Sequence, residues 1–471
     1  MDSVPASSAD PLNSFNTLPD GALTSHRIST LRKNFESNSV YRMAQNAVCK
    51  VTVDDVALNR QVVTNSDFTF SHVLDDWSVT NQKRSGRCWM FAGLNLLRVG
   101  AMKKMNLKEF EFSQNYMFFW DKLERANYFL QRIIERAEHP VDDRSVAWLL
   151  ERPLDDGGQW NMFVNLVKKH GLVPQAFMPE TESSSNSAKM NGILTHKLRE
   201  GAKTLRDMAA KGGSLDELLD AKDEVVGTVY RILSIHLGTP PTNFDWQWND
   251  ADKEFQSDGA MTPQEFADKY ITVPIDDYVC LVHDPRPTSP VGETFTVECL
   301  GNVEGGAIVK YLNVDIDLMK QVAMKTITDG EPVWMGCDVG KMMRSDLGLW
   351  DSELYDYEAI YDTRLTLEKS DRLQYHQTCM THAMLFTGVD VVREDEQQIP
   401  RRWRVENSWG KDNGRKGFYL MNDNWFDQYM FEIAARKEYL PAEFHAALEE
   451  DPIVLPAWDP MGSLAHEAVA F

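Results

Sequence analysis

The spacing of apolar residues along the chain is helical in the first half and strand-like after about residue 275. In NQKRSGRCWMFAGLNLLR (81–98), Met90, Leu94 and Leu97 recur at helical intervals directly after Cys88. Phe91 adds apolar bulk elsewhere around the same axis. The pattern therefore predicts a buried helix with Cys88 in its first turn.

Two more helices are predicted downstream of this segment. FSQNYMFFWDKLERANYFLQRIIERAEH (112–139) should form one long helix, with Ser113 as its N-cap and Pro140 beyond its end. In DDGGQWNMFVNLVKKHGLVP (155–174), a glycine turn precedes a short helix, which Gly171 and Pro174 end.

The middle of the chain reads as a helical insertion. The polar run PETESSSNSAKMNG (179–192) predicts a loop or module boundary, and residues 193 to about 270 look helical. Ser214 with Glu217, and Thr262 with Glu265, have the spacing of capping boxes. These two start signals favour helices on both sides of residue 240.

Short β-branched and aromatic segments with turn residues between them dominate the chain after residue 275. One helix is expected among them, in DIDLMKQVAMKTI (315–327). The predicted strands are DYVCLVH (277–283), TFTVECL (294–300), AIVKYLNV (307–314), PVWMGCDV (332–339), HAMLFTGVDVV (382–392), RRWRVENSW (401–409) and GFYLM (417–421). Helices first and strands later predict an α+β fold.

These changes in composition and predicted secondary structure divide the chain into five parts. Residues 1–66 form an N-terminal arm and lead-in, of which the first 25 or so are polar and expected to be disordered or draped over the protein. The others are a helical lobe with Cys88 (67–190), a helical insertion (191–275), a β-rich lobe (276–450) and a C-terminal arm (451–471).

Composition narrows the class of protein. The 471 residues carry 49 Lys plus Arg against 71 Asp plus Glu, a net charge of −22, which disfavours nucleic acid and anionic membranes as partners. No run of 18 apolar residues and no signal peptide is recognisable, so a cytoplasmic protein is expected. Six scattered cysteines suit a reducing compartment.

Cys88 has two interpretations, a packing residue or a nucleophile. A thiol in the first turn of a helix lies at the positive end of the helix dipole, which lowers its pKa. Its flanks favour the nucleophile, because Gln82 lies six residues upstream, Ser85 and Gly86 form a tight turn, and Trp89 follows.

A nucleophilic cysteine needs a base and a group that orients the base. His382 opens a predicted strand, and Asn407 ends the next one, 25 residues later. A hairpin would place Asn407 beside His382, where its amide oxygen would fix the imidazole, and Trp409 could shield that hydrogen bond. A histidine at the start of a strand is more often an ordinary core residue, and the combination with Asn407 and Trp409 singles this one out.

Rival chemistries have less support. His376, Cys379 and His382 are capable of binding a metal, but no second ligand cluster accompanies them. His466 and Glu467 begin a zincin motif whose fifth position is Ala470. There is no serine-hydrolase elbow and no phosphate loop. We therefore expect neither a metal nor another cofactor.

In sequence order, Gln82, the turn from Ser85 to Trp89, His382 and the segment ENSWG around Asn407 resemble the papain-like cysteine peptidases. The chain is specifically similar to the bleomycin hydrolase (aminopeptidase C) family from about residue 25 onward. The segments that carry this similarity include NQKRSGRCWMFA, DDGGQW and PAWDPMGSLA. The resemblance implies a two-lobed fold and a cysteine aminopeptidase.

The resemblance also implies roles for residues. Cys88 would be the nucleophile, His382 the general base and Asn407 its orienting partner, while Gln82 and the Cys88 backbone N–H would form the oxyanion hole. Gly157 and Gly158 match a glycine pair that binds the substrate backbone, although a plain turn before a helix is an equally good interpretation.

In this family a C-terminal arm lies in the cleft and holds the free amine of the substrate, and here the arm matches through about Ala465. The chain continues for six residues, which leads us to expect that the enzyme trims its own tail.

The resemblance further implies a homohexamer that acts on peptides with a free N-terminus. A cysteine endopeptidase, or a non-catalytic or nucleic-acid-binding assembly on the same fold, is the alternative. Ser85 stands where secreted relatives have a disulfide-forming cysteine, in agreement with a cytosolic protein.

Overall fold

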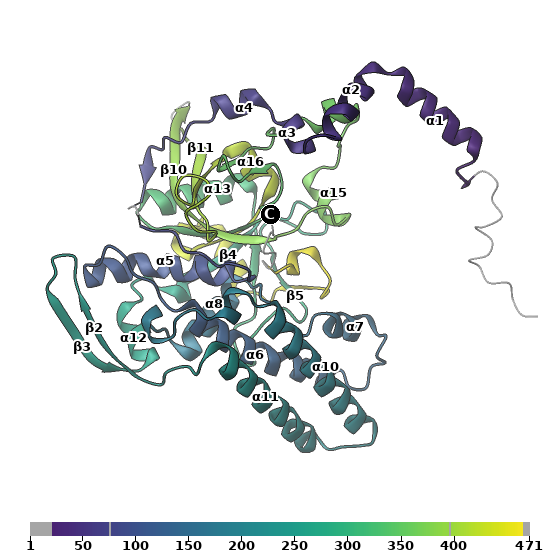
Figure 1. The fold of residues 1–471 in the computed structure, drawn as a ribbon. Helices are drawn as coiled ribbons and strands as arrows, with labels where there is room; N and C mark the ends of the chain where they lie inside the picture. The colour runs from purple at the N-terminus through teal and green to yellow at the C-terminus, as the bar shows by residue number, and fades with distance from the viewer. Residues whose placement is uncertain (1–20, 75–76, 395–396, 465–471) are drawn as a thin grey trace, which may run out of the picture. The chain divides into compact units, whose positions relative to one another are not determined.

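The computed structural model describes residues 21–74, 77–394 and 397–464 (Figure 1). These residues form two compact units, one of residues 21–61 with 355–366 and one of the described residues within 62–354 and 367–464. The α-helices are α1 (Ser25–Ser37), α2 (Ser39–Val48), α3 (Val53–Ala57), α4 (Arg60–Asn65), α5 (Cys88–Met105), α6 (Gln114–Glu135), α7 (Arg144–Glu151), α8 (Trp160–His170), α9 (Glu182–Ser185), α10 (Ala188–Ala210), α11 (Leu215–Leu237), α12 (Pro263–Tyr270), α13 (Ile316–Thr328), α14 (Tyr357–Tyr361), α15 (Lys369–Gln374) and α16 (Asp423–Tyr429).

One mixed sheet runs in the order β14-β5-β6-β4-β13-β7-β10-β11-β12-β9-β8, with β1 beside β10, and β2 and β3 form a separate hairpin. The strands are β1 (His72–Val73), β2 (Phe244–Asn249), β3 (Phe255–Met261), β4 (Tyr278–Val282), β5 (Thr294–Val297), β6 (Tyr311–Asn313), β7 (Val333–Cys337), β8 (Met343–Arg344), β9 (Leu349–Trp350), β10 (His382–Glu394), β11 (Gln397–Glu406), β12 (Phe418–Asn422), β13 (Met430–Arg436) and β14 (Ile453–Leu455).

The large sheet separates two apolar cores. Trp334 on β7 and Ala383 on β10 belong to the core that contains α5, α6 and α8. Met335 and Met384, their neighbours in sequence, belong to the core that contains α13 and α16. Side chains alternate between the faces of a strand, so both faces of these strands are buried. The α+β architecture expected from the sequence is confirmed.

The predicted helix starts are confirmed where a local cap sets them. Ser113 accepts a hydrogen bond from Tyr116 N at 3.0 Å at the start of α6. Complete capping boxes begin α11 at Ser214 and α12 at Thr262. Gly171, with a φ of 69°, ends α8 in a left-handed conformation that favours glycine.

Two sequence-based expectations are wrong. The loop, one of the two interpretations of the polar run 179–192, is wrong because the run contains α9 and the start of α10. The region 193–270 is not helical throughout, because β2 and β3 form a hairpin within it. Phe244 and Trp246 on β2 pack against Phe177 and Phe266, so aromatic packing stabilises strands in this place.

The smaller unit is held together by its own polar contacts. The Tyr41 hydroxyl donates to Asp362 at 2.6 Å, and the Tyr357 hydroxyl donates to Asp54 at 2.7 Å. No residue of α1 or α2 is buried. Residues 1–20, the greater part of the expected polar arm, lie outside the described residues. Within the described ranges, no helix has both the length and the apolar character that a membrane crossing requires.

Candidate active site

Cys88 is the first residue of α5 and lies against the start of β10. The backbone N–H of Ala383, the residue after His382, donates to Cys88 Sγ at 3.4 Å. Arg87, at the N-cap position, makes no side-chain capping bond. The first backbone N–H groups of α5 therefore receive no hydrogen bond from the Arg87 side chain. The Cys88 thiol at this helix start is 1% exposed.

His382 and Asn407 lie side by side because β10 and β11 form an antiparallel hairpin. His382 Nε2 is 2.9 Å from Asn407 Oδ1, and this oxygen also accepts the backbone N–H of Ser408 at 2.7 Å. An oxygen that accepts from Ser408 makes Nε2 the protonated ring nitrogen, so Nδ1 of the neutral imidazole carries a lone pair. Nδ1 is buried and has no hydrogen-bond partner in the described part of the chain.

Trp409 covers this hydrogen bond. Its ring centroid is 5.0 Å from that of the His382 imidazole, with an angle of 38° between the planes. The hairpin geometry expected from the spacing of His382 and Asn407 is thus confirmed. The ring can shield the hydrogen bond from water, which strengthens it.

The side chain of Gln82 is fixed by two hydrogen bonds. Its Nε2 donates to Ser85 O at 2.7 Å, and its Oε1 accepts from the Ser408 hydroxyl at 2.6 Å. Gln82 N also donates to Ser408 O at 2.8 Å. An amide nitrogen has two hydrogens, so one N–H of Gln82 remains after the bond to Ser85.

Burial sets the protonation of the thiol and the imidazole. It raises the pKa of Cys88 to about 12, although backbone N–H groups of Ala383, Trp89 and Cys88 act in the opposite direction. It lowers the pKa of His382 to about 4, against the effect of the Asn407 hydrogen bond. The expectation that the helix N-terminus lowers the thiol pKa is therefore wrong for this closed site, because desolvation outweighs it. Burial therefore favours the uncharged forms of the thiol and the imidazole in the closed site.

The end of the described chain lies close to this site. Ser463 O accepts from Gln159 Nε2 at 2.7 Å, and the Ser463 hydroxyl donates to Met380 O at 2.8 Å. Met380 is two residues before His382, and Gln159 follows the predicted glycine pair. Ala465, which the resemblance to the family predicts to lie in the cleft, and all residues after it lie outside the described residues.

The structure gives Gly157 and Gly158 structural constraints. A Cβ at Gly158 would lie 2.6 Å from the indole of Trp89, the residue after Cys88, so only glycine fits. Gly157 N donates to Asp155 at 3.0 Å, and the Gly157 carbonyl accepts from Arg125. The pair therefore allows close packing of the turn on the helix that carries the thiol.

Sequence reasoning missed the side chains that hold the Cys88 turn. Arg87, which is fully buried, makes a bidentate ion pair with Glu180 at 2.9 and 2.7 Å. Asp156 accepts from Gly86 N at 3.2 Å, and its backbone carbonyl accepts from the Trp89 indole at 2.7 Å. Arg87 lies in the motif SGRCW and Asp156 in DDGGQW. Membership of these motifs is the sequence signal that could have indicated both residues.

Asp156 is ionised in spite of its burial. Burial alone would raise its pKa, but the ammonium group of Lys122 and hydrogen bonds from Ser187 and Asn191 hold the pKa well below its usual range. A charged anchor at this point fixes the loop that leads into α5.

Glu432 is a buried carboxyl that the sequence did not single out. Ala383, Gly336 and Glu432 form a row across β10, β7 and β13, so Glu432 lies two strand spacings, about 10 Å, from the residue that contacts Cys88 Sγ. The Glu432 side chain is 2% exposed, and its Oε1 has no hydrogen-bond partner among the described residues. Burial raises the pKa of Glu432 to about 8.

We expect Glu432→Gln to stabilise the protein at alkaline pH. The pKa of Glu432 is higher in the folded protein than in the unfolded chain, so its contribution to stability is complete below about pH 4 and is lost as the pH rises to about 8. Each tenfold change in proton affinity corresponds to about 1.4 kcal/mol. Thermal unfolding of both proteins between pH 5 and pH 9 measures the effect, with the exposed Glu443→Gln as control. Parallel pH profiles of the wild type and Glu432→Gln would contradict this expectation.

The described residues contain no group of three His, Cys, Asp or Glu side chains that could hold a metal ion. His382, one of the three residues weighed as a zinc ligand, is bound to Asn407, and Cys379 lies 3.5 Å from the Ser463 hydroxyl. His382 and Cys379 are thus engaged by Asn407 and by Ser463 near the chain end.

The fold and these contacts define a papain-like cysteine peptidase. The chain belongs to the Peptidase C1-like family, whose model matches residues 22–462. It is 42% identical to bleomycin hydrolase from Gallus gallus over 94% of this chain and 99% of the relative, and 41% identical to bleomycin hydrolase from Homo sapiens over 95% and 100%. Aminopeptidase C from Streptococcus thermophilus is 41% identical over 92% of this chain and 97% of its own.

A solved structure agrees with these relatives. The crystal structure of PepW from Lactobacillus rhamnosis superposes with a TM-score of 0.92 at 42% identity, over 95% of this chain and 100% of that one. The protein is accordingly a cysteine aminopeptidase, a hydrolase of peptide bonds. The endopeptidase and non-catalytic alternatives have no support from these similarities.

Proposed function

We propose that Cys88 is the nucleophile of this aminopeptidase, His382 its general base and Asn407 the orienting partner. The observation that carries the proposal is the Nε2 to Oδ1 hydrogen bond, which leaves the Nδ1 lone pair of His382 to accept the thiol proton. The contact between Cys88 Sγ and Ala383 N supports it, because it places the thiol beside the strand residue that follows the base.

Hydrolysis then proceeds through a thioester. His382 Nδ1 takes the proton of Cys88 as Sγ attacks the carbonyl carbon, and the negative oxygen accepts hydrogen bonds from Gln82 Nε2 and the Cys88 backbone N–H. The imidazolium gives its proton to the departing amine, which breaks the peptide bond. Water, deprotonated by His382, hydrolyses the thioester and releases the free thiol and the amino acid.

We assign the acyl side of the cleft to Gly157, Gly158 and the C-terminal segment up to Ala465. The contacts of Ser463 with Gln159 and Met380 support a chain end that closes the cleft beyond the first substrate residue. A cleft closed in this way accepts a free N-terminus and excludes the middle of a polypeptide.

Paired substrates test this specificity. Peptides with a free N-terminus should be hydrolysed, the same peptides with an acetylated N-terminus should be stable, and iodoacetamide should abolish the hydrolysis by alkylating Cys88. Cleavage of both forms at equal rates would instead indicate an endopeptidase.

We expect Asn407→Ala to retain part of the activity. The change removes the partner of His382 Nε2 but keeps nucleophile and base, so kcat should fall by about 10-fold to 10³-fold. Steady-state kinetics with a free-amine substrate measures it, and the exposed Asn413→Ala is the matched control. An unchanged kcat would show that the hydrogen bond between His382 and Asn407 does not orient the base.

We further propose that the protein is a cytoplasmic homohexamer. None of the six cysteines, all of which lie in the described ranges, forms a disulfide, which supports a reducing compartment. Leu31, Phe35, Val40 and Met43 on α1 and α2 are exposed apolar residues, which supports burial against other subunits. Mass photometry of the full chain measures the assembly, and a monomer at micromolar concentration would contradict it.

A further inference from the structure

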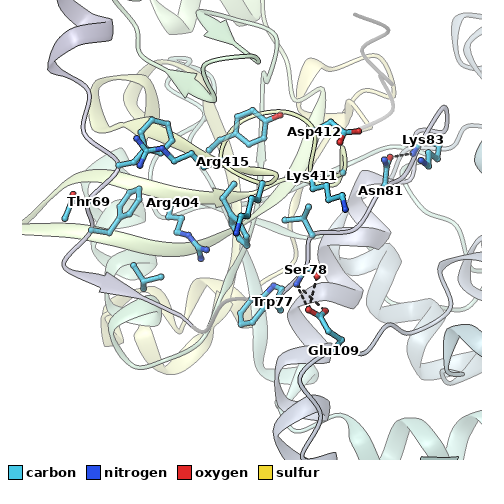
Figure 2. Close-up of a pocket in the computed structure, with 18 residues that line it drawn as sticks. Thr69, Trp77, Ser78, Asn81, Lys83, Glu109, Arg404, Lys411, Asp412 and Arg415 are labelled. Atoms are coloured by element: carbon cyan, nitrogen blue, oxygen red, sulfur yellow. Dashed lines mark hydrogen bonds between the residues drawn. The ribbon is translucent and has the colours of Figure 1, made fainter. Parts of the chain in front are cut away.

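A cavity of about 1080 Å³, partly open to solvent, lies beside the segments that carry Gln82 and Asn407. Figure 2 shows Asn81 and Lys83 near Lys411 and Asp412, with Arg404 and Arg415 at the other end of the cavity. We call this cavity the basic pocket. It has the size of a site for a small molecule or a short peptide segment, and the proposed peptidase mechanism does not use it.

The lining of the basic pocket is cationic on a protein of net charge −22. Its basic residues are Lys83, Arg404, Lys411, Arg415 and Lys416, against the two lining acids Glu109 and Asp412. A positive concavity on a negative body concentrates anions locally.

One of the two acidic side chains that line the basic pocket already accepts hydrogen bonds from the protein. Glu109 accepts hydrogen bonds from Ser78 N at 3.2 Å and from the Ser78 hydroxyl at 2.8 Å. Lys411 and Lys416 are exposed and make no ion pair with any carboxylate in the described ranges. Their ammonium groups are therefore available to a ligand.

Aromatic rings hold the guanidinium groups in place. Arg404, which is 8% exposed, lies 3.6 Å from the ring centroid of Phe418, and Arg415 lies 3.8 Å from that of Phe68. Phe70, another lining residue, is half-buried and so presents part of its ring. Planar cations stacked on rings, beside further aromatic surface, suit a ligand that joins an anion to a flat apolar body.

The walls of the basic pocket continue into the catalytic segments. Asn81 forms a β-bridge with Trp409, and Gly410 N donates to Thr80 O at 3.0 Å. Between them, the Ser408 hydroxyl bonds to Gln82 Oε1. A ligand that moves the Lys411 loop or the Asn81 segment therefore acts on the residues proposed to stabilise the oxyanion and to orient His382.

We propose that the basic pocket binds a carboxylate attached to an aromatic group, and that its occupancy changes turnover at Cys88. Two sources carry this chemistry: the downstream residues of a peptide substrate, which end in a carboxylate, and a separate small carboxylate. The coupling rests on the proposed roles of Gln82 and Asn407, whereas the binding itself does not.

Binding is tested on the full-length wild type with 3-phenylpropanoate and its neutral amide as probes, by isothermal titration calorimetry. The carboxylate should bind more tightly than the amide. In Lys411→Gln/Lys416→Gln its affinity should fall by about 10-fold or more, as for the loss of charge-assisted hydrogen bonds. Lys189→Gln/Lys253→Gln, which also removes two exposed lysines, is the matched control and should bind like the wild type.

Kinetics separates the two sources. If 3-phenylpropanoate changes kcat/KM for an aminoacyl anilide in the wild type but not in Lys411→Gln/Lys416→Gln, the ligand is a separate effector. If peptides ending in a carboxylate have a lower KM than their amides only when Lys411 and Lys416 are present, it is the substrate itself. Equal binding of carboxylate and amide, or equal behaviour of the wild type and Lys411→Gln/Lys416→Gln, would overturn the proposal. Failure of the active-site assignments would instead appear as full activity in Cys88→Ser.

Discussion

Cys88→Ser is expected to abolish peptide hydrolysis, with a fall in kcat of about 10⁴-fold or more. The hydroxyl is a far weaker acid than the thiol, so the neutral imidazole of His382 cannot take its proton readily. Initial rates with a free-amine peptide, at enzyme concentrations high enough to detect the residual rate, measure the loss. Thermal unfolding should show a folded protein, because the substitution changes one atom in a buried position.

Cys49→Ser is the control for this experiment, because Cys49 is an exposed free thiol. It should retain the full rate and remain sensitive to iodoacetamide. A Cys88→Ser protein that hydrolyses peptides within about tenfold of the wild-type rate would exclude Cys88 as the nucleophile.

Arg98→Met is expected to destabilise the protein by about 3 to 5 kcal/mol. Arg98 Nη2 and Glu406 Oε1 are 2.9 Å apart, and both side chains are 1% exposed. Glu406 also accepts from Asn95 at 2.9 Å and from the Trp77 indole at 2.6 Å. Without Arg98 the carboxylate keeps two neutral donors and the charge of Arg404 but loses the cation that is bonded to it, and a buried carboxylate without a directly bonded cation is costly.

The double variant Arg98→Met/Glu406→Gln separates charge from packing. The amide that replaces the Glu406 carboxylate in that protein has no charge but keeps only one acceptor oxygen, for either the Trp77 indole or Asn95, so part of the lost stability should return. Urea denaturation of the single and double variants gives the comparison. A single variant less than about 1 kcal/mol below the wild type would show that this ion pair contributes little.

The elements that could be predicted from sequence are those that nearby residues determine. Ser113 and Ser214 cap the helices that follow them, and the spacing of His382 and Asn407 sets the hairpin that joins them. The β2–β3 hairpin was missed although Phe244 and Trp246 alternate as strand residues do, because the capping boxes on either side favoured helix for the whole region.

The contacts that hold the candidate site depend on residues far apart in the chain. Arg87 forms an ion pair with Glu180, and Glu432 pairs with Gly336 on the neighbouring strand. No local sequence pattern predicts either contact. The pKa of Cys88 was misjudged for the same reason. The start of α5 is visible in sequence, but the burial that raises the pKa of the thiol depends on how distant segments close over it.

The burial of Cys88 also bears on how this enzyme survives oxidants. Peroxides attack thiolates, and burial both raises the pKa of the Cys88 thiol and leaves it 1% exposed, which slows their reaction with it. Cys49, which is exposed, is the first thiol that an oxidant meets. The Cys88 thiol should therefore be oxidised more slowly than Cys49, and its alkylation by iodoacetamide should be slow as well.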